Sequence, residues 1–195
     1  HTARFIEKTN ANPLTVVSLL GSLTKSAGSN SYEVALQIAK SLDATCYNYV
    51  APMIVAKEAE RDAILALGHI QAVQKMIRSS SVAIVGIGEV SSQCSLAQSG
   101  VLGTEEMRHL IGEGAVADVV GNFIDLSGQL VDVDVNRRMV SIDLETLSQI
   151  ENVFAVAGGL WKVQAISAAL RSGSINNLIT DAQTAEQILQ MNRLL

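Results

Sequence analysis

Short apolar runs alternate with amphipathic stretches from one end of the chain to the other. We expect the apolar runs to be strands, at residues 15–20, 44–50, 81–87, 153–157 and 176–179. After the first run, Tyr32, Ala35, Leu36, Ala39 and Leu42 recur at the spacing of one helix face. Because this alternation is typical of βαβ units, the sequence predicts an α/β fold with a Rossmann-like, mostly parallel sheet flanked by helices.

Local signals place the ends of further helices. Residues 57–77 are helical in composition, with Gly68 as a possible break. Thr104 is expected to cap a helix that carries two acidic residues in its first turn. Gly173 follows an amphipathic stretch in the position of a helix C-cap, and Asp181 is a good N-cap for the last helix. Helices and strands are therefore expected to alternate to the end of the chain.

The pattern changes near residues 121–142. Residues 123–125, a turn at Ser127-Gly128 and residues 131–135 predict a hairpin, and so a small antiparallel excursion from the parallel sheet. The chain shows no linker, internal repeat or low-complexity tract. We therefore expect residues 1–195 to form a single domain.

Composition excludes several classes of protein. Apolar residues make up 48% of the chain and charged residues 17%, the reverse of a disordered chain. The net charge is −5, so we do not expect the chain to bind nucleic acid by itself. The longest apolar stretch, residues 82–88, is far shorter than the roughly 20 residues that span a bilayer. Cys46 and Cys94 stand in apolar sequence, which favours free thiols in a reducing compartment, so we expect a cytoplasmic protein.

Glycines follow three of the predicted strands. They are Gly21, then Gly86 and Gly88, then Gly158 and Gly159. In a parallel sheet the loops after the strands converge on one crevice, and glycine lets a ligand approach the backbone amides of a helix N-terminus. The sequence therefore predicts an anion site at this edge, with ordinary tight turns as the alternative.

No cofactor site is predicted. Gly86, Gly88 and Ser91 only approach the dinucleotide fingerprint, and no phosphate-binding loop of the Walker type occurs. The histidines show no metal-ligand spacing; they are His1, His69 and His109. Trp161 is expected to be packed, and aromatic residues are only 4% of the chain, too few to indicate binding of single-stranded nucleic acid.

Three charged residues are candidates for ligand contact. Lys162 opposes the dipole of the helix it begins, so it is expected to meet a phosphate or to form an imine with an aldehyde, unless it is simply solvated. Asp118 could accept sugar hydroxyls or act as a general base, or it could be bonded to loop amides. Arg137 could clamp an anion, or it could pair with Asp132 or Asp134.

The order of short motifs resembles the effector-binding domain of SorC-type sugar-responsive transcriptional regulators. The matching segments are residues 82–88, 114–118, 121–128, 157–162, 165–171 and 178–181. The resemblance implies a fold similar to sugar-phosphate isomerases, glucosamine-phosphate deaminases and coenzyme A transferases. It implies a phosphorylated-sugar effector, a DNA-binding helix-turn-helix domain missing from this chain, operator binding through that domain, and a homodimer or homotetramer.

Site residues follow from the resemblance and the strand-end pattern together. The candidate ligand-binding set is Gly21, Ser22, Asn30, Ser31, Gly86, Gly88, Asp118, Arg137 and Lys162. The chain has Gly21-Ser22 where many members have two glycines, and Ala117-Asp118 where they commonly have Gly-Asp. An added side chain at either place is expected to narrow the crevice and change which sugar fits.

Three functions were weighed. The favoured one is a sensor that binds a sugar phosphate without turnover and changes oligomer state. The alternative is an isomerase or deaminase-like enzyme with Asp118 as the base and Lys162 on the phosphate or in an imine. That enzyme needs a second acid–base group, and Glu89 is a candidate that matches no pattern. A purely structural oligomerisation domain would leave the three glycine-ended strands unexplained.

Overall fold

Parallel strands form the framework of the molecule, as the sequence predicts. The computed structural model describes residues 14–22 and 34–193. Strands β1 (Thr15–Ser22) and β2 (Thr45–Pro52) pair in parallel. Strands β3 (Val82–Val85), β7 (Asn152–Val156) and β8 (Asn177–Ile179) form a second parallel sheet in the order β3-β7-β8. The mostly parallel α/β class is confirmed.

A small antiparallel sheet branches from the end of β3. It consists of β4 (Gly88–Glu89), β5 (Ala117–Val119) and β6 (Asn122–Ile124), in that order. Val120 and Gly121 both have positive φ, 53° and 79°, which turns β5 tightly into β6. The predicted antiparallel excursion is confirmed, and its strands begin earlier in the chain than the sequence indicated.

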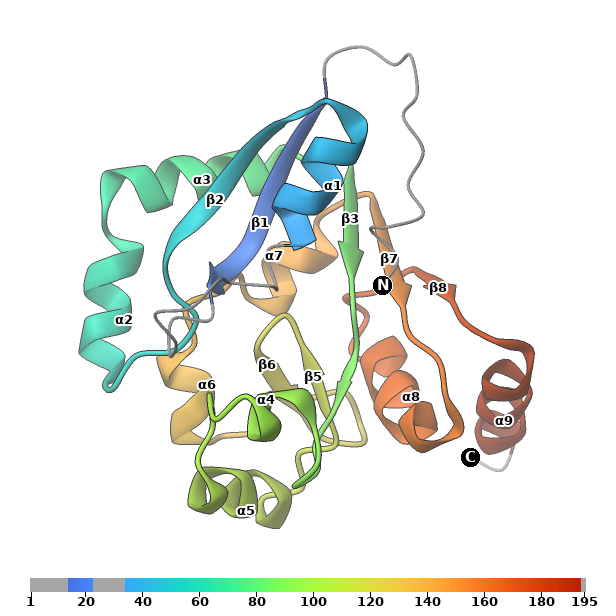
Figure 1. Ribbon diagram of the computed structural model, residues 1–195. Helices are drawn as coiled ribbons and strands as arrows, with labels where there is room; N and C mark the ends of the chain where they lie inside the picture. Colours follow the sequence, from blue (N-terminus) through green and yellow to red (C-terminus); the bar gives the residue numbers. More distant parts are fainter. Residues whose placement is uncertain (1–13, 23–33, 194–195) are drawn as a thin grey trace.

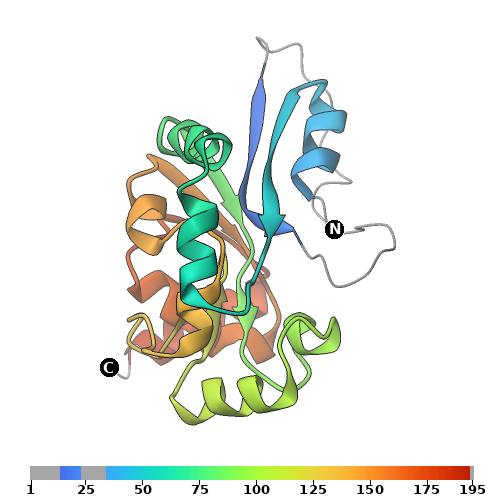
Figure 2. The ribbon, with the colours of Figure 1, turned by 90° about the vertical axis from the view of Figure 1, so that its left-hand side faces the viewer.

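Helices cover the strands on several sides (Figure 1). Their bounds are α1 (Val34–Leu42), α2 (Glu58–Leu65), α3 (Gly68–Arg78), α4 (Ser95–Gln98), α5 (Thr104–Gly112), α6 (Asp134–Arg138), α7 (Leu144–Ser148), α8 (Val163–Arg171) and α9 (Ala182–Arg193). A short 3-10 turn, η2 (Leu160–Lys162), precedes α8. Figure 2 shows β1, β2 and α1 to one side of the layer that contains β3 and β7. None of the described helices is long and apolar enough to cross a membrane.

The strand periodicity accounts for the main core. In β3, Ala83 and Val85 point inward, and the paired strand β7 contributes Val153 and Ala155 on the same face. Helix α8 packs its buried face against β5, with Ile166 fully buried. A second apolar cluster surrounds the antiparallel sheet; it includes Leu110 of α5 and Phe123 of β6.

The predicted helix ends are largely confirmed. Gly68 begins α3 after a two-residue break from α2. Gly173, with a φ of 72°, follows α8, and the Asp181 Oδ1 accepts from the Thr184 backbone N–H at 2.8 Å at the start of α9. Thr104 is the first residue of α5 rather than its cap: Gly103 is the N-cap, and its N–H donates to Glu106 Oε2 at 2.8 Å.

The expected strand at residues 131–135 is wrong. Only one antiparallel bridge, Ile124 to Leu130, extends the pairing, and the chain then enters α6. Beyond the Val131 N–H, which donates to the Phe123 carbonyl at 3.0 Å, the side chain of Asn136 bonds to β6 in place of a further strand. Its Oδ1 accepts from the Phe123 N–H at 2.8 Å, and its Nδ2 donates to the Phe123 and Val131 carbonyls at 3.0 and 2.7 Å.

Candidate functional site

The carboxyl ends of β3 and β7 leave the parallel sheet at the same edge. Val85 of β3 pairs with Ala155 of β7, so the loops at Gly86 and Gly158 start side by side. A Cβ placed on Gly86 would meet no atom within 4 Å, so the backbone there is open to approach. This edge is where ligands bind in open α/β sheets.

Asp118 of β5 lies directly against the strand that continues from this edge. It pairs with Gly88 of β4, and a Cβ placed on Gly88 would lie 3.3 Å from the Asp118 Cβ. The Asp118 Oδ1 accepts from the Gly121 N–H at 2.7 Å. Burial raises the pKa of Asp118 to about 6, although the Gly121 hydrogen bond and the charge of Lys162 both act to lower it. The carboxyl group therefore titrates close to neutral pH.

Lys162 reaches the same edge from the turn before α8. Its Nζ donates to the Ile87 carbonyl at 2.8 Å, which ties the start of α8 to the end of β3. Among residues 14–22 and 34–193, no carboxylate lies within ion-pair distance of this ammonium group. Because an ammonium group has three donors, two remain for a ligand. The structure thus brings Lys162, Asp118, Gly86 and Gly88 together.

The Gly158-Gly159 loop has a structural role. The Gly159 N–H donates to Asp181 Oδ2 at 3.0 Å and to Thr184 Oγ1 at 2.8 Å. A Cβ on Gly158 would lie 2.6 Å from Asp181 Oδ2. Bonds from the Thr184 hydroxyl and from backbone amides hold the pKa of Asp181 below its usual value. For this loop the tight-turn alternative holds, because its Gly159 amide is already bonded within the protein.

Trp161 lies in the turn before α8, next to Lys162, and its side chain is 74% exposed. The prediction that it is packed is wrong. The six-membered ring of the indole lies over Gly159: a Cβ on Gly159 would lie 2.7 Å from the Trp161 Cη2. The φ of Gly159, 108°, belongs to the region that favours glycine. Because glycine has no Cβ, the Trp161 ring can lie close to its backbone.

Gly21 is buried, and its amide is already bonded. The Gly21 N–H donates to the Val140 carbonyl at 2.9 Å, and a Cβ there would lie 2.7 Å from the Ala51 carbonyl oxygen. Close packing of β1 on β2 therefore requires a glycine at this position. The carbonyl of Ser22 accepts from the Met53 N–H at 2.9 Å. The candidates Asn30 and Ser31 lie outside the described residues.

Arg137 lies in α6, where its guanidinium pairs with Asp132 and stands 4.0 Å from Glu58. Pairing with Asp132 is one of the two options that the sequence left open. The two neighbouring arginines differ in their partners, because Arg138 pairs with Asp134 and Glu106. Within the described part of the chain, no three His, Cys, Asp or Glu side chains come together as a metal site.

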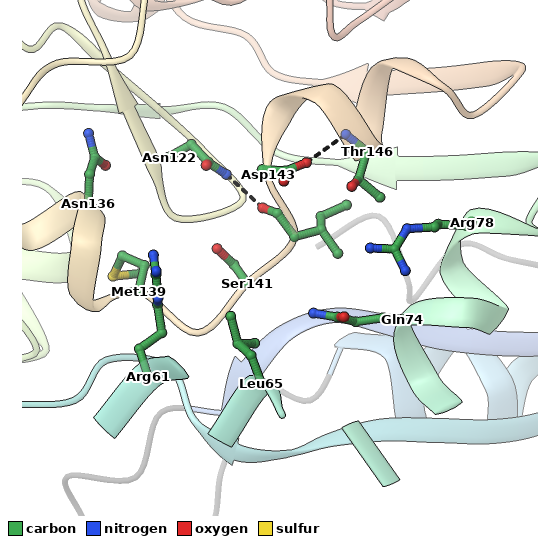
Figure 3. A pocket seen from close by; sticks show the side chains of 11 residues that line it. Arg61, Leu65, Gln74, Arg78, Asn122, Asn136, Met139, Ser141, Asp143 and Thr146 are labelled. Carbon is green, nitrogen blue, oxygen red and sulfur yellow. Dashed lines mark hydrogen bonds between the residues drawn. The ribbon is translucent and has the colours of Figure 1, made fainter. Parts of the chain in front are cut away.

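A cavity lies beside α2 and α3 (Figure 3). None of the residues selected from the sequence lines it. Its cationic side chains are Arg61, which lies in the helical stretch predicted at residues 57–77, and Arg78, the residue directly after that stretch. The opposite wall of the cavity comes from residues more than 40 positions further along the chain. The sequence pattern around the two arginines therefore does not distinguish them from solvated arginines elsewhere.

Nearly the whole chain matches a known domain family. The Sugar-bind family model, described as "Putative sugar-binding domain", matches residues 1–190. The chain is 32% identical over 185 residues to the erythritol catabolism regulatory protein EryD of Brucella abortus, covering 95% of the chain and 58% of that relative. It is 33% identical over 174 residues to the transcriptional regulator LsrR of Escherichia coli O139:H28, covering 86% of the chain and 54% of LsrR. The chain thus spans little more than half the length of these curated relatives.

Solved structures share the fold. The sugar-binding domain of a transcriptional repressor from Vibrio fischeri superposes with a TM-score of 0.86 at 25% identity, over 98% of this chain and 76% of that one. The full-length sorbitol operon regulator SorC from Klebsiella pneumoniae gives a TM-score of 0.84 at 24% identity, over 96% of this chain and 62% of SorC. The chain therefore belongs to the family of sugar-binding domains found in SorC-type transcriptional regulators.

Proposed function

We propose that the chain is the effector-binding domain of a transcriptional regulator, and that its effector is a phosphorylated sugar bound at the carboxyl edge of β3 and β7. The observation that carries this proposal is the Lys162 ammonium group, which keeps two donors beside the Asp118 carboxyl and the open backbone of Gly86. The family match and the regulators among the relatives support it.

Each group has a separate task in this proposal. Lys162 binds the phosphate through charge-assisted hydrogen bonds, which are about twice as strong as neutral ones. Asp118 accepts hydrogen bonds from sugar hydroxyls, and it does so best when it is ionised. Gly86 leaves room for the ligand against the backbone, and Gly88 lets Asp118 pack close to β4. Ser22, Asn30, Ser31 and Arg137 stay candidates for ligand contact, whereas the backbone of Gly21 is already used in packing and hydrogen bonding.

Ligand binding is proposed to change the oligomer and, through it, operator affinity. A ligand shifts such an equilibrium only by its difference in affinity between the two states. Lys162 offers a route, because it bridges the start of α8 and the end of β3 through the Ile87 carbonyl. A phosphate that drew the ammonium away would loosen this link. Operator binding is assigned to a separate DNA-binding domain of the full-length protein, which would act in the cytoplasm.

Turnover is not part of the proposal. An enzyme of the isomerase type needs a second proton-transfer group beside Asp118. Glu89 follows Gly88 in β4, but it pairs with Ala117, and its carboxylate accepts from the Ser91 hydroxyl at 3.3 Å. The named relatives are transcriptional regulators, which favours a sensor over an enzyme.

The test uses the one tryptophan of the chain. Trp161 precedes Lys162 and is exposed, so its fluorescence should report a ligand at the edge. The chain is titrated with four- to six-carbon sugar and polyol phosphates and with their unphosphorylated forms, because one relative is named for erythritol catabolism. We expect saturable binding of a phosphorylated ligand that is recovered unchanged.

Matched lysine variants make the test specific. Lys162→Gln should lose most of the affinity, whereas Lys57→Gln, which changes an exposed lysine at the start of α2, should keep it. Equal affinities of the two variants would remove Lys162 from the site. Chemical conversion of the ligand would establish the enzyme alternative.

A further inference from the structure

The cavity beside α2 and α3 lies between this helix pair and the segment that runs from α6 into α7 (Figure 3). Its volume is about 200 Å³. Since one water in the liquid occupies about 30 Å³, the cavity has room for a small molecule of several heavy atoms. Its lining is mostly polar and consists of Arg61, Leu65, Gln74, Arg78, Asn122, Asn136, Met139, Ser141, Ile142, Asp143 and Thr146.

Two asparagines hold the wall of the cavity in place. Asn136 uses both Nδ2 donors and its Oδ1 in bonds to Phe123 and Val131. The Asn122 Nδ2 donates to the Ile142 carbonyl at 3.0 Å and to the Val119 carbonyl at 3.0 Å. These side chains therefore position the hairpin against residues 139–142 and leave ligand contact to their neighbours.

The α3 wall of the cavity presents two polar side chains, Gln74 and Arg78, that can still form hydrogen bonds with a ligand. Gln74 donates from Nε2 to the Tyr49 hydroxyl at 2.9 Å, which leaves its carbonyl oxygen as an acceptor and fixes the orientation of the amide. Arg78 makes no ion pair with any residue of the described ranges 14–22 and 34–193. In Figure 3, Gln74 and Arg78 face Ser141 and Thr146 across the cavity.

Three charged side chains line the cavity, Arg61, Arg78 and Asp143, and these three sum to one positive charge. Arg61 contributes a guanidinium that it shares with Asp62, at 2.7 Å, and with Glu58, at 3.8 Å. Asp143 caps α7 through the Thr146 N–H at 2.6 Å. A guanidinium with unused donors selects an oxyanion, because its planar fork matches carboxylate and phosphate oxygens. The carboxylate of Asp143 and the amide oxygen of Gln74 accept hydrogen bonds and so select hydroxyl groups.

We propose that this cavity is a second ligand site, which takes a small hydroxylated metabolite carrying an oxyanion, with the oxyanion on Arg78 and a hydroxyl facing Asp143. The oxyanion can be a carboxylate or a phosphate, since both match the guanidinium fork. No lining residue belongs to the Lys162 edge, so the proposal does not depend on the sugar-phosphate function.

The test follows the amide and side-chain resonances of the chain by NMR during titration with inorganic phosphate and, separately, with malate, at constant ionic strength. Resonances of Ser141, Gln74 and the Arg78 Nε should shift saturably with at least one of the two anions. The stronger anion identifies the source of the oxyanion. Absence of a saturable shift up to roughly 10 mM with both anions overturns the proposal.

Two variants and one control separate this site from the other. Arg78→Gln should weaken anion binding by about tenfold or more, the loss expected for a charged hydrogen bond. Arg108→Gln removes an exposed arginine of α5 that pairs with Glu105, and it should bind as the wild type does. Lys162→Gln should also keep the cavity shifts. An equal loss of anion affinity in Arg78→Gln and Arg108→Gln would show a general effect of charge. A loss of affinity in Lys162→Gln alone would assign the anion to the β3–β7 edge. Either result overturns the proposal.

Discussion

Asp118 should reduce the stability of the fold at neutral pH, and Asp118→Asn should restore it. Burial raises its pKa from 3.8 to about 6, so the folded state binds the proton more tightly than the unfolded state does. The free energy of unfolding should therefore fall as the pH rises from about 4 through about 6. A difference of about two pKa units, at 1.36 kcal/mol each, gives a loss of about 3 kcal/mol.

Asn keeps the shape of the side chain and an oxygen that can accept from the Gly121 N–H, but it does not ionise. Urea unfolding should therefore show Asp118→Asn to be more stable than the wild type by about 3 kcal/mol at pH 7, with the gap closing near pH 4. If the free energies of unfolding of the wild type and the variant changed in parallel across this pH range, the raised pKa of Asp118 would be refuted.

Asp125→Asn is the matched control, because folding lowers the pKa of Asp125 whereas it raises the pKa of Asp118. Hydrogen bonds from the Ser127 hydroxyl and from the Gln129 and Ser127 amides lower the pKa of Asp125. Its carboxylate therefore stabilises the fold above about pH 4 and loses that contribution as the pH falls. Asp125→Asn should be less stable than the wild type at pH 7, and the difference should shrink in acid.

Three other substitutions, and a ligand titration of Asp118→Asn, test separate parts of the structure. Lys162→Ala should lower phosphosugar affinity by about 1.5–3 kcal/mol in a fluorescence titration, while circular dichroism shows an intact fold. Asp118→Asn should weaken sugar binding and spare inorganic phosphate; equal loss of both would make Asp118 purely structural. Gly159→Ala should cost about 1–3 kcal/mol in urea unfolding, because its φ is 108° and the new Cβ would meet Trp161. Trp161→Ala should change stability by less than about 0.5 kcal/mol, and a larger loss would show that the exposed indole packs in solution.

Local signals accounted for most of the secondary structure. The break at Gly68 and the caps at Gly173 and Asp181 depend on residues within a few positions, so the sequence contains the information directly. The strand expected at residues 131–135 failed because Asn136 bonds to Phe123, thirteen positions away. A pattern of alternating apolar residues does not reveal a side chain that replaces a strand partner.

The candidate site divides in the same way. The sequence predicted the same role, contact with an anion, for Gly86 and Gly21. The backbone is open at Gly86, whereas at Gly21 β2 leaves no room for a Cβ. The two glycines differ in whether another strand packs against them. At Gly21 this depends on the pairing of β1 with β2, which is distant in the sequence. The contact of Lys162 with the Ile87 carbonyl spans 75 positions, and the cavity beside α3 joins helices to a segment much later in the chain.

The central claim is that a phosphorylated sugar binds the folded chain at the Lys162 edge. The most direct measurement is a thermal-shift screen of the purified chain against phosphorylated and unphosphorylated sugars, repeated with Lys162→Gln. At a hundredfold excess over the dissociation constant, a ligand of the folded state should add about 2.7 kcal/mol to its stability. We predict a shift with a phosphosugar that the variant loses and that leaves the ligand chemically unchanged. A shift of equal size in Lys162→Gln, or no shift with any phosphosugar, would contradict the account.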